Sequence, residues 1–268
     1  MTDRVQVELK APVATITLNK PERLNALDVS MWEAIGEAAV AIDGAPDVRV
    51  AVLKGAGGAF CAGLDVKAGS TLGELNAGSP ASAMVRIHEH LAHLQECFTR
   101  LERTRVPMIA AIERVCIGAG MELALCCDIR IAAEGTIFSI PEVQLGIVPD
   151  MGGTQRLPRT IGVGMAKELI YTARRFDATE ALRIGFVNHV YPAGELGARA
   201  AELAAEIAAN GPLAVQAAKQ SIDGTYWREL PHWLHWEAEQ AVGPLLSEDR
   251  KVGMKAAAER KRAEFQGH

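Results

Sequence analysis

The order of strand-like and helix-like hydrophobic patterns in the N-terminal part of the chain constrains its fold most strongly. Apolar residues alternate with polar ones over residues 5–9 and 14–18, which predicts two strands separated by a turn. Residues 32–42 place apolar side chains at helical spacing, and residues 48–53 predict another strand before a glycine-rich loop. This strand–strand–helix–strand order indicates a mixed α/β layer rather than an all-helical bundle.

The middle of the chain continues the alternation of helices and strands. Residues 68–82 are rich in Gly, Ser and Ala and predict a surface loop. Between residues 84 and 101 the apolar positions step by three and four, which predicts an amphipathic helix. Residues 108–112 are all apolar, which is typical of a strand buried on both faces. A helix that starts at the small residues 118–120 and a strand at residues 129–133 follow.

The C-terminal part of the chain has a different pattern. Beyond Gly162 the hydrophobic spacing is essentially helical, and the last predicted helix covers residues 247–265. No linker and no internal repeat divides the chain. We therefore expect a strand-rich core over residues 1–195 and a helical region over residues 196–268, which covers the core or another copy of it.

Charge and cysteine content restrict the partners and the compartment. The 268 residues carry a formal net charge of −5, which argues against nucleic-acid binding. Residues 250–264 contain six basic and two acidic side chains, and form either a solvated helix face or a contact to a phosphate-bearing ligand or an acidic neighbouring subunit. The five cysteines include no C-x-x-C pair, which fits free thiols. No segment has the roughly 20 uncharged apolar residues of a membrane span, and no apolar signal segment opens the sequence, so we expect a cytoplasmic protein without membrane contact.

Several motifs that suggest cofactor chemistry are incomplete in this sequence. Gly55–Gly58 lacks the spacing and the later acidic residue of a dinucleotide-binding loop. His88, His90 and His93 lie near one another, but no carboxylate or cysteine stands at ligand spacing, so the pattern favours exposed histidines over a metal site. No G-x-S-x-G segment is present, which leaves serine hydrolysis without support.

Two loops rich in small residues each precede a predicted helix start. They are residues 60–65 (FCAGLD) and residues 117–122 (IGAGME). Unpaired N–H groups and the helix dipole at such positions favour negative charge, so two convergent N–H groups could form an oxyanion hole for a carbonyl oxygen. The alternative is that the small residues only allow a helix and a strand to pack closely.

Three carboxylates near these loops suggest acid–base chemistry. Glu122 lies in the apolar run MELALCC, Glu142 lies among apolar neighbours, and Asp150 follows eight residues later. A carboxylate held against apolar walls has a raised pKa and can act as a general acid or base near neutral pH. Each of them taken alone is more typical of a salt-bridge partner or a helix cap.

The motifs together resemble one known family. Residues 109–128 (IAAIERVCIGAGMELALCCD), with FCAGLD before them and PEVQLGIVPDMGGTQRLPRTIG after them, resemble the crotonase superfamily, also called the enoyl-CoA hydratase/isomerase family. The resemblance extends from TITLNKPERLNALD near the start to AAAERKRAEF near the end. It implies an α/β fold, the crotonase (ClpP-like) fold of repeated β-β-α units. It also implies a C-terminal helical region that builds homotrimers, often paired into homohexamers.

The resemblance also implies a substrate and a set of site residues. The substrate would be an acyl-CoA thioester, with no metal and no redox cofactor. The oxyanion-hole amides of the family fall on Leu64 and Ala119, and its two catalytic glutamates fall on Glu122 and Glu142. The coenzyme A contacts of the family fall on Arg23, Leu24, Ala62, Asp65, Val66 and Arg260. Of these, Arg260 would come from the tail of a neighbouring subunit.

Three positions depart from the usual pattern of the family. Arg114 and Ala119 stand where glycine is usual, from which we expect a different shape of the turn at Arg114 and a pocket narrowed by the Ala119 methyl group. Asp150 resembles dienoyl-CoA isomerases, although these usually carry aspartate where this chain has Glu122.

The function expected from the resemblance is an enoyl-CoA hydratase/isomerase. It would act on 2-enoyl-CoA thioesters through an enolate, in fatty-acid β-oxidation. One alternative is a Δ3,5-Δ2,4-dienoyl-CoA isomerase, which Asp150 suggests. Others are thioester hydrolysis or decarboxylation at the same oxyanion hole, and a non-catalytic homologue that binds acyl-CoA.

Overall fold

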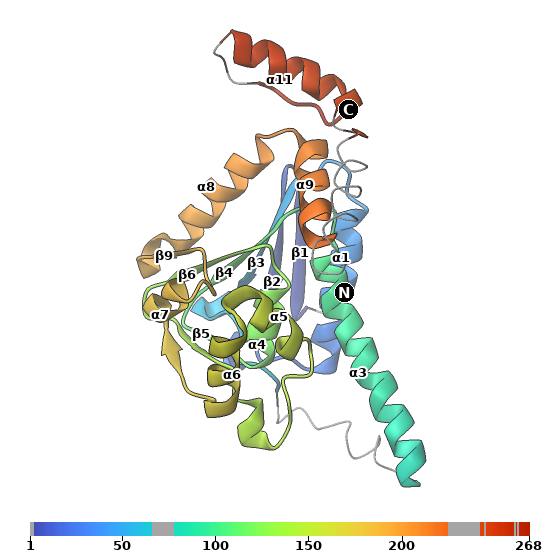
Figure 1. Cartoon of the computed structure of the whole chain (residues 1–268), viewed down its shortest axis with the longest axis vertical. Helices are drawn as coiled ribbons and strands as arrows, with labels where there is room; N and C mark the ends of the chain where they lie inside the picture. Colours follow the sequence, from blue (N-terminus) through green and yellow to red (C-terminus); the bar gives the residue numbers. More distant parts are fainter. Residues whose placement is uncertain (1–2, 66–77, 225–241, 244, 260, 262) are drawn as a thin grey trace.

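The sheet that organises the molecule has six strands in the order β1-β2-β3-β4-β6-β9 (Figure 1). Strands β1 and β2 pair antiparallel, and the remaining neighbours pair parallel. The computed structural model describes residues 3–65, 78–224, 242–243, 245–259, 261 and 263–268. The strands of this sheet are β1 (Val5–Lys10), β2 (Val13–Leu18), β3 (Val50–Gly55), β4 (Met108–Ile112), β6 (Ile129–Ala133) and β9 (His189–Tyr191). A smaller sheet has the order β5-β7-β8 and consists of β5 (Val115–Ile117), β7 (Ile137–Ser139) and β8 (Phe176–Asp177).

The central strands of the large sheet are buried on both faces, and their side chains alternate between two apolar clusters. In β3, Ala51 and Leu53 belong to the main core, whereas Val50 and Val52 face a second cluster. That second cluster is completed by helix α8 (Leu196–Ala208), which lies on the opposite face from α1 (Val29–Asp43). A strand buried on both faces needs apolar residues at every position, which explains the continuous apolar run in β4.

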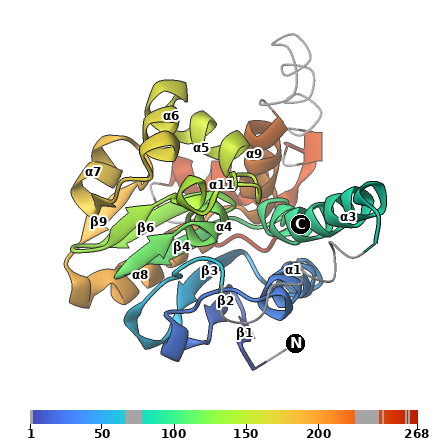
Figure 2. The ribbon, with the colours of Figure 1, turned by 90° about the horizontal axis from the view of Figure 1, so that it is seen from below.

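Helices α1 and α3 (Pro80–Glu102) pack side by side at one end of the sheet (Figure 2). The rings of Trp32 and Phe98 stack between them with centroids 5.5 Å apart. The Asp28 side chain accepts a hydrogen bond from Met31 N at 3.2 Å and caps α1.

The remaining helices of the described residues lie around these layers, and α11 stands apart from the sheet (Figure 1). They are α4 (Ala119–Leu125), α5 (Gly153–Ile161), α6 (Val163–Thr172), α7 (Ala178–Arg183), α9 (Pro212–Gly224) and α11 (Glu248–Ala258). Four short 3-10 helices are η1 (Pro21–Arg23), η2 (Ala56–Gly58), η3 (Glu142–Leu145) and η4 (Ala193–Glu195). The mixed α/β class predicted from the sequence is confirmed. None of the helices within the described residues is long and apolar enough to cross a membrane.

Helix α3 and the C-terminal part of the chain differ from the predicted elements. Helix α3 begins at Pro80, inside the predicted 68–82 loop, because Ser79 caps it by accepting a hydrogen bond from Ser82 N. The stretch beyond Gly162 is not wholly helical, since it contains β8 and β9, which are too short to show a period of two.

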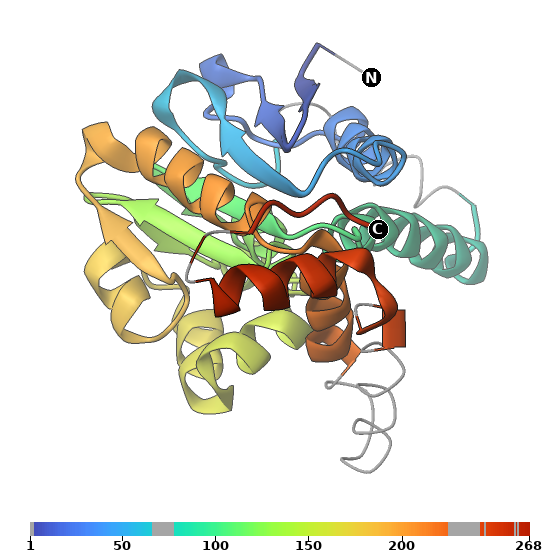
Figure 3. The same cartoon turned by 90° about the horizontal axis from the view of Figure 1, so that it is seen from above.

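Helix α11 ends at Ala258, whereas the predicted helix continued to residue 265. The Asp249 carboxylate accepts hydrogen bonds from Gln266 N and Gly267 N at 2.7 and 2.8 Å. This holds the tail alongside α11 (Figure 3). The predicted division into residues 1–195 and 196–268 stays a prediction, and α8, which follows that boundary, packs on the sheet.

Candidate active site

The two small-residue loops lie side by side after β3 and within the β5–α4 segment. Cys61 and Cys116 form a parallel bridge, in which Ile117 N donates to Cys61 O at 3.0 Å. Leu64 and Ala119 each lie three residues beyond this pair. The parallel register therefore brings the two predicted oxyanion-hole residues to the same place in the fold.

A glycine makes the close approach of these loops possible. A Cβ on Gly63 would lie 2.7 Å from Ile117 O and 3.6 Å from Ala119 N, and Gly63 has φ +93°. The 2.7 Å distance to Ile117 O and the positive φ both disfavour any larger residue at position 63. Among the residues that the structure describes, neither Leu64 N nor Ala119 N donates a hydrogen bond to another group of the chain. Two neighbouring N–H groups are thus available to a carbonyl oxygen, one of them at the first residue of α4.

Glu122 lies one turn into α4 and is 1% exposed. Its Oε1 accepts hydrogen bonds from Met151 N at 2.9 Å and Gly153 N at 2.8 Å. Burial raises the pKa of Glu122 to about 8, and the charges of Glu142 and Asp150 add to the shift, whereas the two N–H donors oppose it. This carboxyl can therefore exchange a proton near neutral pH.

Glu142 lies in η3 and faces the start of α4. A Cβ on Gly118 would lie 2.7 Å from Glu142 Oε1, so glycine is required for this contact. The Oε2 atom of Glu142 is buried and has no hydrogen-bond partner in the described part of the chain. Burial raises the pKa of Glu142, and the charge of Asp150 adds to this. A buried carboxyl oxygen without a partner costs free energy unless a ligand completes it.

Asp150 completes the group of carboxylates at this end of the sheet. Burial raises the pKa of Asp150 as well, and its charge acts on both glutamates. The three predicted catalytic carboxylates are therefore brought together. Like charges this close cannot all ionise cheaply, so the group separates into members that hold a proton and members that release one.

Four of the predicted coenzyme A contacts also lie at this end of the sheet. Ala62 N donates to Leu24 O at 2.9 Å, and Arg23 Nη2 lies 3.1 Å from Asp65 Oδ1. The 20–28 loop and the 61–65 loop are thus fixed against each other. The other two predicted contacts, Val66 and Arg260, lie outside the described residues.

Lys20 is a further residue of this site that the sequence did not reveal. It is 5% exposed, and its Nζ lies 2.8 Å from Asp65 Oδ2 and 2.7 Å from Asp28 Oδ2. The Asp65 carboxylate is therefore shared between two cations next to Leu64. In the sequence, Lys20 is marked only by Asp28 eight positions later. Its other partner, Asp65, lies 45 positions away and gives no local signal.

The departures at Arg114 and Ala119 change little in the backbone. Arg114 has φ +63°, so the turn keeps the left-handed conformation that glycine favours. Ala119 is 5% exposed and retains its N–H at the start of α4.

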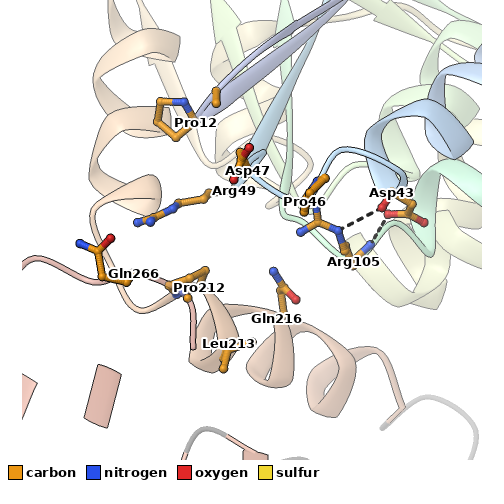
Figure 4. Close-up of a pocket in the computed structure, with 12 residues that line it drawn as sticks. Pro12, Asp43, Pro46, Asp47, Arg49, Arg105, Pro212, Leu213, Gln216 and Gln266 are labelled. Carbon is orange, nitrogen blue, oxygen red and sulfur yellow. Dashed lines mark hydrogen bonds between the residues drawn. The ribbon is translucent and has the colours of Figure 1, made fainter. Parts of the chain in front are cut away.

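A cavity of about 700 Å³ lies at the other end of the sheet (Figure 4). It is lined by residues that precede β2, β3 and β4, and none of the predicted site residues belongs to it. Arg49 donates to Ala208 O at 3.1 Å and to Phe265 O at 2.9 Å across its wall. This region therefore joins the core to the C-terminal segments and is separate from the carboxylates.

Comparisons with known proteins identify the family of this chain. The family model described as enoyl-CoA hydratase/isomerase matches residues 8–268. The chain is 38% identical to a short-chain-enoyl-CoA hydratase of Clostridium acetobutylicum, over 98% of this chain and 97% of that protein. It is 36% identical to a crotonyl-CoA hydratase of Syntrophomonas wolfei, over 98% of both chains.

A solved structure shows the same fold. The crystal structure of an enoyl-CoA hydratase from Bacillus anthracis matches with a TM-score of 0.89 and 36% identity, over 99% of this chain and 100% of that chain. The predicted crotonase fold and the predicted resemblance are both confirmed. The chain belongs to the enoyl-CoA hydratase/isomerase family, within the crotonase superfamily.

Proposed function

We propose that this protein is an enoyl-CoA hydratase, which adds water across the double bond of a 2-enoyl-CoA thioester. The observation that carries the proposal is the pair of unengaged amides, Leu64 N and Ala119 N, presented by adjacent loops beside buried carboxylates. The names of the relatives from Clostridium acetobutylicum and Syntrophomonas wolfei support the same reaction.

The oxyanion hole stabilises the charge that develops during addition. The thioester oxygen accepts hydrogen bonds from both amides, and negative charge grows on it as C3 is attacked and an enolate forms. One such donor changes a rate typically by about 10²- to 10³-fold. The position of Ala119 at the start of α4 adds the favourable end of the helix dipole.

The two glutamates move the protons. Ionised Glu122 takes a proton from water while the water oxygen bonds to C3 and the π electrons pass into the enolate. Glu142 then gives its proton to C2, and the adjacent carboxyls exchange a proton to restore their starting states. Water contributes its oxygen to C3, and one hydrogen is gained at C2. The overall addition is redox-neutral, so we propose that no redox cofactor takes part, and we propose from the family resemblance that no metal does.

Asp150 favours a second candidate activity, dienoyl-CoA isomerisation. In this reaction no water adds, and Glu142 with Asp150 moves a proton along the conjugated chain. The raised pKa of Asp150 and its interaction with Glu142 fit such a transfer.

We further propose a role in fatty-acid β-oxidation in the cytoplasm. The assembly proposed is a homotrimer or homohexamer. The family resemblance supports the pathway and the assembly, which product analysis and gel filtration test, whereas the cysteine content supports the location.

Replacing Ala119 with proline tests the oxyanion hole directly. Proline lacks the N–H but is tolerated at the first position of a helix. We expect Ala119→Pro to lower kcat with crotonyl-CoA by about 10²- to 10³-fold. Ala119→Gly keeps the N–H and should retain activity within a few-fold. Circular dichroism checks that both variants fold. If folded Ala119→Pro were as active as Ala119→Gly, the role of this amide would be contradicted.

Glu122→Gln is expected to stabilise the protein at alkaline pH while abolishing hydration. The pKa of Glu122 is about 8, above its ordinary 4.5, so the folded state binds a proton that the unfolded state has released. The stability of the protein therefore falls as pH rises from about 4.5 to 8. The glutamine variant avoids this loss, and we expect a gain of roughly 2–4 kcal/mol at pH 9 that narrows toward pH 5.

Urea denaturation at pH 5, 7 and 9 measures this difference. Glu206→Gln, on the exposed face of α8, is the matched control and should show no such pH dependence. A difference between Glu122→Gln and the unsubstituted protein that stays constant with pH would show that Glu122 titrates normally.

Glu142→Gln is expected to lower turnover of 2-enoyl-CoA esters at least a hundredfold, since the amide cannot deliver a proton to C2. Turnover is followed by ultraviolet absorbance and product mass, beside a binding titration. An unsubstituted protein that binds acyl-CoA without turnover would support the non-catalytic reading. Release of free coenzyme A would indicate thioester hydrolysis, and carbon dioxide release from a carboxyacyl-CoA would indicate decarboxylation.

Asp150→Asn separates hydration from isomerisation. We expect loss of 3,5-dienoyl-CoA isomerisation with hydration of crotonyl-CoA retained, because only the isomerisation uses the Asp150 carboxylate. The assay compares both substrates on one preparation. Equal loss of both activities would refute this division of roles.

A further inference from the structure

Arg156, on helix α5, lies behind the loop that holds Glu122. Its Nη1 donates to Met151 O at 3.1 Å. Its Nε and Nη2 donate to the two oxygens of Glu102 at 3.1 and 2.7 Å, and Nη2 also donates to Thr99 Oγ1 at 3.2 Å. The paired contact with Glu102 fixes the plane of the guanidinium, because both groups are planar and the geometry is fork-like.

The loop between Asp150 and α5 is shaped around this guanidinium. Gly152 has φ +100°, and a Cβ at this position would collide with Arg156 Nη1. The residues on either side, Met151 and Gly153, are those whose N–H groups donate to Glu122 Oε1. Met151 therefore contacts Glu122 with its N–H and Arg156 with its carbonyl oxygen.

Glu102 is itself fixed by a C-terminal helix. It is the last residue of α3, and its carbonyl oxygen accepts a hydrogen bond from Lys219 Nζ of α9 at 3.0 Å. Lys219 is 8% exposed and also lies 2.6 Å from Asp128 Oδ1. The ion pair between Arg156 and Glu102 thus has a rigid support on two helices.

We propose that Arg156, held by Glu102, is a positioning residue for Glu122. It fixes the 151–153 loop so that two N–H groups bind the Glu122 carboxylate and stabilise its ionised form. Arg156 touches no reacting atom, and it acts through the loop. This inference deepens the proposed hydratase function, on which it rests for its kinetic consequence.

The charges around Glu122 determine the direction of the expected change. Glu142 and Asp150 raise the pKa of Glu122, whereas the N–H groups of Met151 and Gly153 lower it. The neighbouring Cys126 thiol has a pKa raised to about 12 by burial and is neutral at pH 7. The Arg156 guanidinium interacts with Glu122 as a cation. Releasing the loop therefore removes stabilisation of the carboxylate, and the pKa of Glu122 should rise further.

The first test is a titration that does not depend on activity. Glu122 is observed by carbon NMR in protein labelled at glutamate carboxyls, with Glu122→Gln identifying its signal. We expect Arg156→Met to shift the Glu122 titration to higher pH by about one unit or more, Arg156→Lys to shift it less, and Arg159→Gln, on the exposed side of α5, to leave it unchanged. An unchanged titration in folded Arg156→Met would overturn the proposal.

Glu102→Gln keeps the arginine and carries the test if Arg156→Met does not fold. It weakens the ion pair, so the Glu122 titration should move in the same direction by a smaller amount. No movement in that variant would overturn the proposal.

The second test is kinetic and separates this inference from the proposed function. With crotonyl-CoA, Arg156→Met should lower kcat at pH 7 about tenfold or more and leave KM within twofold. The rising limb of the pH profile of kcat/KM should shift to higher pH. A lowered kcat with an unshifted profile would contradict the positioning role. If the unsubstituted protein has no hydratase activity, the proposed function fails, while the NMR titration still decides the role of Arg156.

Discussion

The parallel pairing of two loops at Cys61 and Cys116 is the contact on which the candidate site depends. It places Leu64 and Ala119 at matching positions, each three residues further along its chain. Leu64 N is available because the parallel bridge to Leu27 uses the carbonyl oxygen of Gly63 and the N–H of Asp65 instead. Gly63 permits the approach, since any side chain at this position would meet Ile117 O. A main-chain device of this kind depends little on side-chain identity, so alanine at position 119 and arginine at position 114 are compatible with the same backbone.

The buried carboxylates impose a cost that the rest of the fold has to offset. Glu122 and Glu142 lie against apolar walls, and burial raises the pKa of both. The sheet offsets this cost by burying apolar side chains on both faces, with α8 on one side and α1 on the other. A sheet buried on one face only would bury less apolar area, and would gain less free energy to offset the cost of burying these carboxyl groups.

Much of the site could be predicted from sequence because its signals are local. Each signal is confined to a few consecutive positions: the small residues of the 60–65 loop, those of the 117–122 loop, and a glutamate inside an apolar run. Lys20 and Arg156 could not be found in this way, since their partners Asp65 and Glu102 lie 45 and 54 residues away. For the fold, the helix at 84–101 was predicted from its period. Strands of two and three residues were missed because pairing with β7 and β6, rather than their own pattern, defines them.

Both residues that sequence reasoning missed perform the same physical task at opposite sides of the site. Lys20 neutralises Asp65 beside Leu64, and Arg156 pairs with Glu102 behind the loop that contacts Glu122. Lys20 Nζ binds the carboxylates of Asp28 and Asp65, whereas Arg156 binds the Glu102 carboxylate and the carbonyl oxygen of Met151. Because the proposed reaction depends on N–H groups of the main chain, its precision depends on how rigidly those loops are held. Under the proposed role of Arg156, the ion pairs of Lys20 and Arg156 supply that rigidity, which accounts for cations around a site whose reacting groups are carboxylates and amides.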